Sequence, residues 1–182
     1  FNNVIGSGFP LVTNLFGTQK RAEVAFGGNA ARFVRRAVDV VRHALPPTLG
    51  KAWDARDLVM SGLRVGLRRS GSGPVTEICE GPNLTKLPVL TCWPEDGGPY
   101  ITLTAVTSKD PKRGIRNVGM YRVQQLGKDT VAMHWQRHKV GAAHWREMAE
   151  RGEKMPVCII VGADPASVFS ASAPLPPNID EF

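Results

Sequence analysis

The sequence predicts an α+β protein in which a small α/β segment, residues 1–74, precedes a β-rich domain with helical insertions, residues 75–182. Three observations support this fold class. Apolar residues in the first part recur at the spacing of amphipathic helices. The second part consists of runs of β-branched and aromatic residues separated by turn residues. Between them, the segment SGSGP at residues 70–74 has the composition of a domain boundary.

The first part is predicted to hold a strand and two helices. A short strand over residues 11–16 is followed by a helix over residues 18–26, which the glycine pair at 27–28 ends. Asn29 can cap a second helix, which the prolines at 46–47 stop. The apolar residues of this second helix recur at helical spacing and are Phe33, Val34, Ala37, Val38, Val41 and Ala44.

In the middle of the chain, the sequence pattern changes from that of helices to that of β-strands. Residues 51–69 form a helix or a loosely ordered arm, and the sequence leaves both alternatives open. The turn signals PEDGGP, KDPKRG and LGKD then separate predicted strands. These strands are expected at residues 87–93, 100–108, 119–126 and 129–135.

The last part is predicted to contain two helices and one strand. Residues 141–151 are expected to form a helix, and residues 155–162 a buried strand. Asp164 caps a short helix in the segment DPASVFSASA, with Pro165 at its first position. Residues 174–182 are expected to leave the domain as an extended segment.

The composition excludes several classes of protein. No apolar run approaches the ~20 residues that span a bilayer, and the first residues lack the basic start and apolar core of a signal peptide. Cys79, Cys92 and Cys158 contain no CxxC pair, which argues against a disulfide framework or a zinc site. We therefore expect buried free thiols in a cytoplasmic protein.

The net charge of +7 raises the question of nucleic-acid binding, and its distribution argues against it. Residues 1–75 hold 11 Lys and Arg against 4 Asp and Glu, whereas residues 76–182 hold 12 of each kind. The basic excess lies on amphipathic segments without interleaved aromatic residues, as on a solvated or subunit-contacting face. A nucleic-acid-binding barrel is therefore disfavoured, and no nucleic-acid partner is expected.

Residues 116–145 gather groups that bind phosphate, metals or planar rings. The stretch RNVGMYR supplies an Asn, a Tyr and an Arg, and the run HWQRHK follows. His134 and His138 have the i, i+4 spacing of metal ligands on a helix, but in an extended strand they would lie ~13 Å apart. We therefore expect at most one of them to bind a given metal ion.

These motifs resemble those of one enzyme family. From LPVLTCW to PLPPNIDEF, about residues 87–182, the sequence closely resembles the UbiD family, and GSGFPLVTNLFGTQKR near the start resembles it more weakly. The family comprises 3-polyprenyl-4-hydroxybenzoate carboxy-lyases and related reversible decarboxylases that use prenylated FMN. The resemblance implies a split β-barrel of the flavin-reductase type that holds the cofactor and is flanked by α/β segments.

The resemblance also implies the site residues. It places Asn117, His138 and Glu181 on a divalent metal that clamps the cofactor phosphate, with His138 preferred over His134. Ser172 and the carbonyls around it resemble a site where relatives hold a potassium ion. The residues placed along the prenylated FMN are Met120, Tyr121, Arg122, His134, Trp135 and Gln136, followed by Lys139 and Val140.

The chemistry of these residues fits the implied roles. A flavin phosphate is a dianion, and the oxygens of Asn117 and Glu181 suit a hard cation such as Mn²⁺ or Mg²⁺. Arg122, the implied catalytic residue, can hold a substrate carboxylate through two parallel hydrogen bonds and orient it for loss of CO₂. The implied function is the cofactor- and metal-binding portion of a reversible, non-oxidative decarboxylase of aromatic or α,β-unsaturated carboxylic acids.

The resemblance carries further expectations about the whole enzyme. Family enzymes are far longer than this chain, and their proton-donating carboxylate lies beyond the segment that matches residues 174–182. We therefore expect no general acid here, since Glu77, Glu80 and Glu95 are not matched to that role, and no activity from this chain alone. The alternative is a non-catalytic flavin-binding subunit that needs a partner chain. The implied partners are a small carboxylic acid as substrate, a flavin prenyltransferase as cofactor supplier and further copies of the protein in a homo-oligomer.

Overall fold

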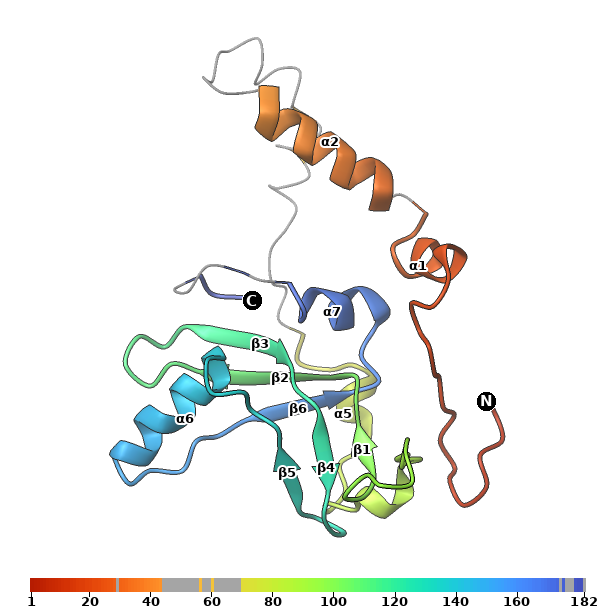
Figure 1. Ribbon diagram of the computed structural model, residues 1–182, viewed down its shortest axis with the longest axis vertical. Coiled ribbons are helices and arrows are strands. Elements are labelled where there is room, and N and C mark those ends of the chain that lie inside the picture. Colours follow the sequence, from red (N-terminus) through yellow and green to blue (C-terminus); the bar gives the residue numbers. More distant parts are fainter. Residues whose placement is uncertain are drawn as a thin grey trace. The chain divides into compact units, whose positions relative to one another are not determined.

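The computed structural model describes residues 1–28, 30–43, 56, 60, 70–173, 175 and 179–181 (Figure 1). The chain divides into two compact units, of which one joins Phe1–Leu15 to Glu80–Phe182 and the other comprises Phe16–Cys79. The domain division predicted between residues 74 and 75 stays a prediction. The elements in chain order are α1 (Gln19–Ala25), α2 (Ala30–His43), α5 (Pro74–Glu77), the 3-10 helix η1 (Leu84–Lys86), β1 (Tyr100–Ile101), β2 (Thr104–Lys109), β3 (Arg116–Met120), β4 (Val123–Gln125), β5 (Val131–Met133), α6 (Val140–Glu150), β6 (Cys158–Val161) and α7 (Pro165–Ser170).

Both helices predicted in the first part are present, as α1 and α2. α1 begins after Thr18, whose hydroxyl accepts a hydrogen bond from the Arg21 N–H at 3.2 Å. It ends before Gly27 and Gly28, which have φ angles of 66° and 75°. This left-handed backbone is where a helix commonly stops, and glycine adopts it without steric strain.

Some predictions fall on residues that the structure does not describe. They concern the helix cap at Asn29, the helix end at residues 46–47, the state of residues 51–69 apart from positions 56 and 60, and most of the extended segment 174–182. At the predicted boundary, residues 70–73 lead into α5, which has Pro74 at its first position.

The strand predicted over residues 11–16 is wrong. These residues belong to no strand, and Val12 is 65% exposed. Asn14 has a φ of 52°, in the left-handed region that a strand residue does not adopt. A strand needs a neighbour along its whole length for its backbone N–H and C=O groups. Leu11 forms such a pair, through two backbone hydrogen bonds of 2.9 Å with Phe1, but in the described part of the chain this pairing does not extend into a ladder.

The β-rich part forms two three-stranded antiparallel sheets. One has the order β1-β4-β5 and the other β3-β2-β6. The run predicted as one strand over residues 100–108 is divided into β1 and β2, and the run over 119–126 is divided between β3 and β4. The chain passes from one sheet to the other at residues 102–103 and again at residues 121–122, so the prediction of two unbroken strands is wrong.

The structure bears out a small mixed fold of helices and antiparallel sheets, but not a closed barrel. Among the described residues, no strand of one sheet pairs with a strand of the other. Residues 87–93, predicted as a strand, form only a single bridge between Leu90 and Tyr100. Pro88 in this run has no N–H to donate to a neighbouring strand, which limits its pairing.

The strand predicted over residues 129–135 is shorter than expected. β5 ends at Met133, and residues 136–139 of the HWQRHK run form a turn that leads into α6. The extended geometry assumed for His134 and His138 is therefore wrong, because the chain turns between them.

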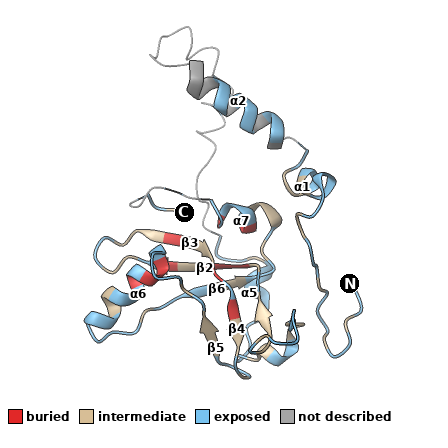
Figure 2. Ribbon diagram, viewed as in Figure 1, coloured by how far each residue is buried: buried red, intermediate tan, exposed pale blue. Residues whose placement is uncertain are grey.

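Buried residues lie on strands of both sheets (Figure 2). The buried centre of the core consists of Val106 of β2, Val123 of β4 and Tyr121, which lies where the chain crosses between the sheets. Burial of side chains of this size contributes about 1.5–3 kcal/mol each. α6 packs against β2 and β3, and α7 packs against β2. The partly buried residues packed against the centre are Val131, Met133, Trp135 and Ile159.

The predicted elements of the last part are present, although their burial differs from expectation. Asp164 caps α7 by accepting hydrogen bonds from the N–H groups of Ala166 and Ser167 at 3.0 and 3.1 Å. The strand predicted as buried is β6, an edge strand whose Val161 is 47% exposed. The prediction of buried thiols is also wrong, because all three cysteines are exposed and unpaired. None of the helices in the described residues is long and apolar enough to cross a bilayer.

Candidate functional site

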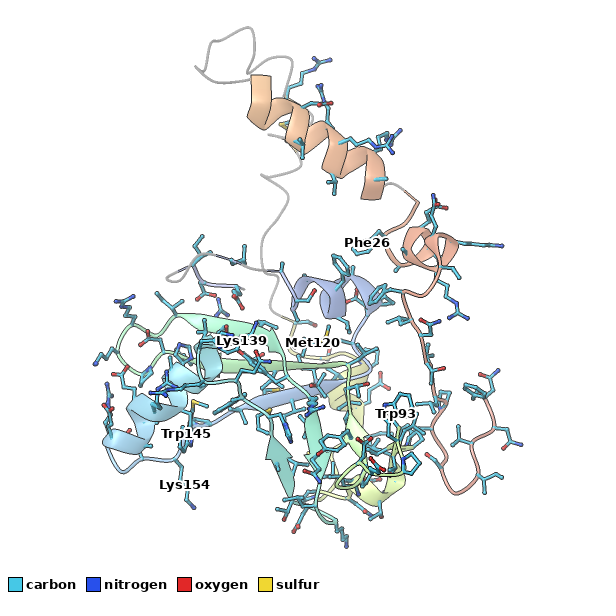
Figure 3. The ribbon with its side chains drawn as sticks, in the orientation of Figure 1. Phe26, Trp93, Met120, Lys139, Trp145 and Lys154 are labelled. Carbon is cyan, nitrogen blue, oxygen red and sulfur yellow. The ribbon has the colours of Figure 1, made fainter. Side chains whose placement is uncertain are left out.

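A hollow of about 270 Å³ opens beside β3 and the start of α6. Figure 3 shows Lys139, one of its lining residues, where α6 begins. The polar residues that line it include Asn117, His138, Lys139, His144, Glu147 and Glu181. The three residues expected to bind metal therefore line one hollow. His134 is not among its lining residues and instead contacts Arg122.

Asn117 is positioned by strand pairing. It lies opposite Ser108 in the β2–β3 ladder and is only 6% exposed. Its amide nitrogen donates to the hydroxyl of Tyr121 at 3.4 Å. This contact directs the amide group, whose oxygen forms no hydrogen bond within the described ranges, and such an oxygen suits a hard cation.

Glu181 reaches the same hollow from the other end of the chain. Its backbone N–H donates to the carbonyl of Arg116 at 3.2 Å, so the final segment runs alongside β3. An ion pair between Arg116 and Asp180, with Nε and Oδ1 2.9 Å apart, holds the segment in this place. One carboxylate oxygen of Glu181 accepts a hydrogen bond from the Val118 N–H. The other oxygen remains for a ligand.

His138 and Lys139 enter the hollow from the turn before α6. Lys139 is the residue that precedes the helix, and its own side chain does not cap the first turn of α6, where the Gly141 N–H donates to the Tyr121 hydroxyl. The N-terminus of a helix attracts anions through its free N–H groups and its dipole, and the lysine ammonium adds a positive charge. Among the described residues, no cluster of three or more His, Cys, Asp or Glu side chains could hold a metal. The candidate ligand set therefore depends on the amide of Asn117 beside His138 and Glu181.

Tyr121 connects the hollow to the core. Its hydroxyl accepts hydrogen bonds from Asn117 and from the Gly141 N–H of α6, the latter at 3.2 Å. Its ring contacts Trp135 edge to face, with ring centroids 6.2 Å apart. The indole Nε1 of Trp135 is a buried donor with no acceptor in the described part of the chain. Such a donor fits a ligand that brings its own acceptor atoms, as a flavin phosphate or ring does.

Arg122 belongs to a second group of side chains. Its Nε and Nη2 both lie 3.3 Å from Nδ1 of His134. The guanidinium carbon lies 5.2 Å from the centre of the Tyr100 ring, in a cation–π contact. Arg122 and His134 are exposed, so this group is accessible to a small molecule.

The remaining predicted cofactor residues are distributed around these two groups. Met120 ends β3 (Figure 3), and its N–H donates to the carbonyl of Ala171, directly before Ser172. The Ser172 hydroxyl donates to the Phe169 carbonyl at 2.6 Å, at the end of α7. Gln136 is exposed in the turn before α6, and Val140 begins α6 and lines the hollow.

The sequence interpretation missed His144 and Ser108. His144 is a lining residue of the hollow, is 7% exposed, and has Nδ1 3.0 Å from the hydroxyl oxygen of Ser108. Burial lowers the pKa of His144 below its ordinary value of 6.5, although the charges of Asp110, Glu147 and Glu181 oppose that shift. One sequence signal could have revealed the burial of His144. The small residues Gly141 and Ala142 allow the first turn of α6 to lie close to the sheet, and His144 follows on the same helix.

The stability of the metal-free protein is expected to fall as the pH drops below 6.5. The depressed pKa of His144 means that the unfolded chain takes up this proton before the folded chain does, so acid favours unfolding until the folded-state pKa is passed. Urea unfolding in EDTA at pH 7.5 and at pH 5.5 measures the loss. The variant His144→Gln should lose less stability over this interval, and an equal loss in both proteins would show that another group is responsible.

Comparison with known proteins identifies the family. Residues 67–182 match the model of the Rift-related domain of 3-octaprenyl-4-hydroxybenzoate carboxy-lyase, UbiD, and residues 1–41 match the model of its N-terminal domain. A 4-hydroxybenzoate decarboxylase subunit of Chlamydia pneumoniae is 36% identical over 183 residues, which cover all of this chain and 31% of that relative. The chain spans between 31% and 38% of the length of the curated relatives compared.

Solved structures agree with this placement. The UbiD-class enzyme HmfF from Pelotomaculum thermopropionicum, in complex with FMN, aligns with all of this chain and 37% of its own, with a TM-score of 0.75 and 25% identity. An evolved dimeric form of the same enzyme, in complex with prFMN, gives the same TM-score and identity over 39% of its chain. The family model matches residues 67–182, which make up well over half of this chain. The chain therefore belongs to the UbiD family of carboxy-lyases.

Proposed function

We propose that this chain is the cofactor- and metal-binding portion of a decarboxylase that removes CO₂, reversibly and without oxidation, from an aromatic or α,β-unsaturated carboxylic acid. The observation that carries the proposal is the shared hollow of Asn117, His138 and Glu181, which three separate segments of the chain bring together. The FMN and prFMN complexes of HmfF support prenylated FMN as the cofactor.

The metal and the cofactor phosphate belong to the hollow. Asn117, His138 and Glu181 would hold Mn²⁺ or Mg²⁺, which screens the charge of the phosphate dianion. Lys139 and the start of α6 add positive potential on the same side. The unsatisfied Trp135 Nε1 and the stretch from Met120 to Arg122 would lie along the flavin, and Ser172 would contribute to a potassium site.

Arg122 would bind the substrate carboxylate. Its guanidinium keeps a fixed positive charge and a planar set of donors, which orient a carboxylate and exclude other placements. When bound, the flavin supplies the electron sink for the loss of CO₂.

Family membership supports further proposals about the whole protein. We propose that the two sheets form part of a split β-barrel in the whole protein, that the protein assembles into a homo-oligomer in the cytoplasm, and that a flavin prenyltransferase supplies its cofactor. The evolved dimeric form of HmfF supports assembly between copies.

The variant Glu181→Gln is expected to lose metal and flavin together. Glutamine keeps an oxygen that can accept from the Val118 N–H, so the pairing along β3 can persist. The neutral amide is a poorer ligand for a hard cation, and metal affinity should fall by about tenfold or more, since changes outside the coordination shell already produce that loss. Elemental analysis and flavin absorbance of the purified protein measure both contents.

The matched control for this variant is Glu153→Gln. Glu153 is exposed in the turn after α6 and lies away from the hollow, so its variant should retain wild-type metal and flavin. If Glu181→Gln retains full metal and flavin as well, Glu181 is not a metal ligand.

A further inference from the structure

Tyr100, Arg122 and His134 meet on one face of the sheet β1-β4-β5. Tyr100 lies opposite Gln124 of β4, and Arg122, the residue directly before β4, is two positions from Gln124 and so faces the same side. The His134 N–H donates to the Arg122 carbonyl at 3.1 Å, which extends the β4–β5 pairing by one residue beyond Val123 and Met133. Tyr100 thus belongs to β1, Arg122 directly precedes β4 and His134 directly follows β5, and the backbone pairing fixes their spacing.

The contacts hold the guanidinium group on two sides. Nε and Nη2 both point at Nδ1 of His134, at 3.3 Å each, so the imidazole occupies the side-on pair of donors. Tyr100 faces the guanidinium carbon at 5.2 Å, and its ring meets the His134 ring edge to face at 5.5 Å. In the part of the chain that the structure describes, the end-on pair, one N–H each from Nη1 and Nη2, has no acceptor and can take a carboxylate.

We propose that His134 and Tyr100 are positioning residues that present the end-on donors of Arg122 to the substrate carboxylate. This inference rests on the proposed function, because it assumes that Arg122 binds the carboxylate. Nδ1 of His134 can accept these hydrogen bonds only when it carries no proton, so the neutral imidazole carries its proton on Nε2. The Tyr100 ring acts through its face, and its hydroxyl is not needed for the contact.

The first test is spectroscopic and independent of turnover. The ¹⁵N chemical shifts of His134 in histidine-labelled, flavin-loaded protein at pH 8 should show an unprotonated Nδ1 and a protonated Nε2. Replacing Arg122 with alanine should move the Nδ1 signal, because its donors are then lost. A proton on Nδ1 in the unaltered protein would overturn the inference.

The second test asks whether Tyr100 acts through its ring or its hydroxyl. It also asks whether His134 acts as a hydrogen-bond acceptor or only through its ring. In the complete enzyme, Tyr100→Leu and His134→Leu should each raise the KM for the carboxylic acid, and the Kd of a non-reactive carboxylate analogue, on the order of tenfold. Tyr100→Phe keeps the aromatic face and His134→Gln keeps an acceptor, so both should recover a large part of the lost affinity. Values are compared only for variants with wild-type flavin content and melting temperature.

The outcomes distinguish this inference from the proposed function. If Arg122→Ala retains turnover per bound flavin and affinity for the analogue, the proposed role of Arg122 fails, and the inference fails with it. If Arg122→Ala loses both while the two leucine variants keep wild-type KM and Kd, only the positioning role is overturned. Folded leucine variants with weakened affinity, and recovery in their conservative counterparts, support it.

Discussion

In the complete enzyme, replacing Arg122 with lysine is expected to lower turnover per bound flavin by about a hundredfold or more, while flavin and metal contents stay near those of the wild type. Lysine keeps one positive charge but loses the planar donors that hold a carboxylate in two parallel hydrogen bonds. A misplaced substrate reacts far more slowly, because the geometry of the reacting groups sets much of the barrier. The ammonium group also cannot reproduce the paired contact with Nδ1 of His134.

The measurement is initial rate divided by the concentration of bound flavin, at saturating and at limiting substrate. Arg146→Lys is the matched control. Arg146 is exposed on α6, where its Nη1 donates to the Arg137 carbonyl at 2.8 Å, and a lysine there can still donate. Near-equal turnover per flavin in Arg122→Lys and in this control would remove Arg122 from the catalytic residues.

The helices were predictable because their signals are local. Thr18 and Asp164 each accept hydrogen bonds from the first turn that follows them, and such capping side chains can be recognised in the sequence without knowledge of the rest of the fold. The strands were harder to predict. A run such as GMYRVQQL has the composition of one strand, yet Tyr121 turns inward and the chain crosses to the other sheet. Strand composition does not reveal which partner each half will find.

Burial was predicted less well than secondary structure. Cysteine is often buried, but Cys158 lies on β6, an edge strand with few neighbours in the described part of the chain. A pattern of apolar residues indicates where a strand forms and does not indicate whether that strand ends up in the middle of a sheet or at its edge. The position of β6 is a property of the assembled sheet.

Some residues of the candidate site could be predicted from the sequence, and others could not. Resemblance to known sequences placed Asn117, His138 and Glu181, and the structure brings them to one hollow. Ser108 and His144 are 36 residues apart and meet only because α6 packs on the β2–β3 hairpin. Tyr100 has no motif of its own, and its contact with Arg122 depends on the strand order β1-β4-β5. These contributions come from tertiary packing, which a local pattern does not contain.

Gly119→Ala is expected to destabilise the protein by about 1–3 kcal/mol, as overpacking of a core does. In a strand interior, alanine in place of glycine ordinarily stabilises by about 0.5–1 kcal/mol, so the sign of the effect is informative. A Cβ on Gly119 would lie 2.2 Å from Cε2, 2.6 Å from Cζ and 2.8 Å from the hydroxyl of Tyr121. Gly119 has no unusual φ, so the destabilisation would come from this contact alone.

The Tyr121 ring has little room to move. It is 7% exposed and packs with Val106 and Val123 in the core. Its displacement would also break the hydrogen bonds that its hydroxyl accepts from Asn117 and from the Gly141 N–H, and so disturb the hollow. Flavin content of the variant should therefore fall together with its stability.

Urea unfolding of Gly119→Ala and of Gly127→Ala, the matched control, tests this expectation. The nearest atom to a Cβ on Gly127 is the Thr130 Cβ at 3.9 Å, an ordinary contact, so the control should change stability little. A double-mutant cycle then identifies the cause: in a Tyr121→Ala background the clash is absent, and Gly119→Ala should no longer destabilise. If the alanine is equally destabilising in both backgrounds, the close approach of Tyr121 to Gly119 is not what requires glycine in β3, and the link from this strand to the hollow must run through other side chains.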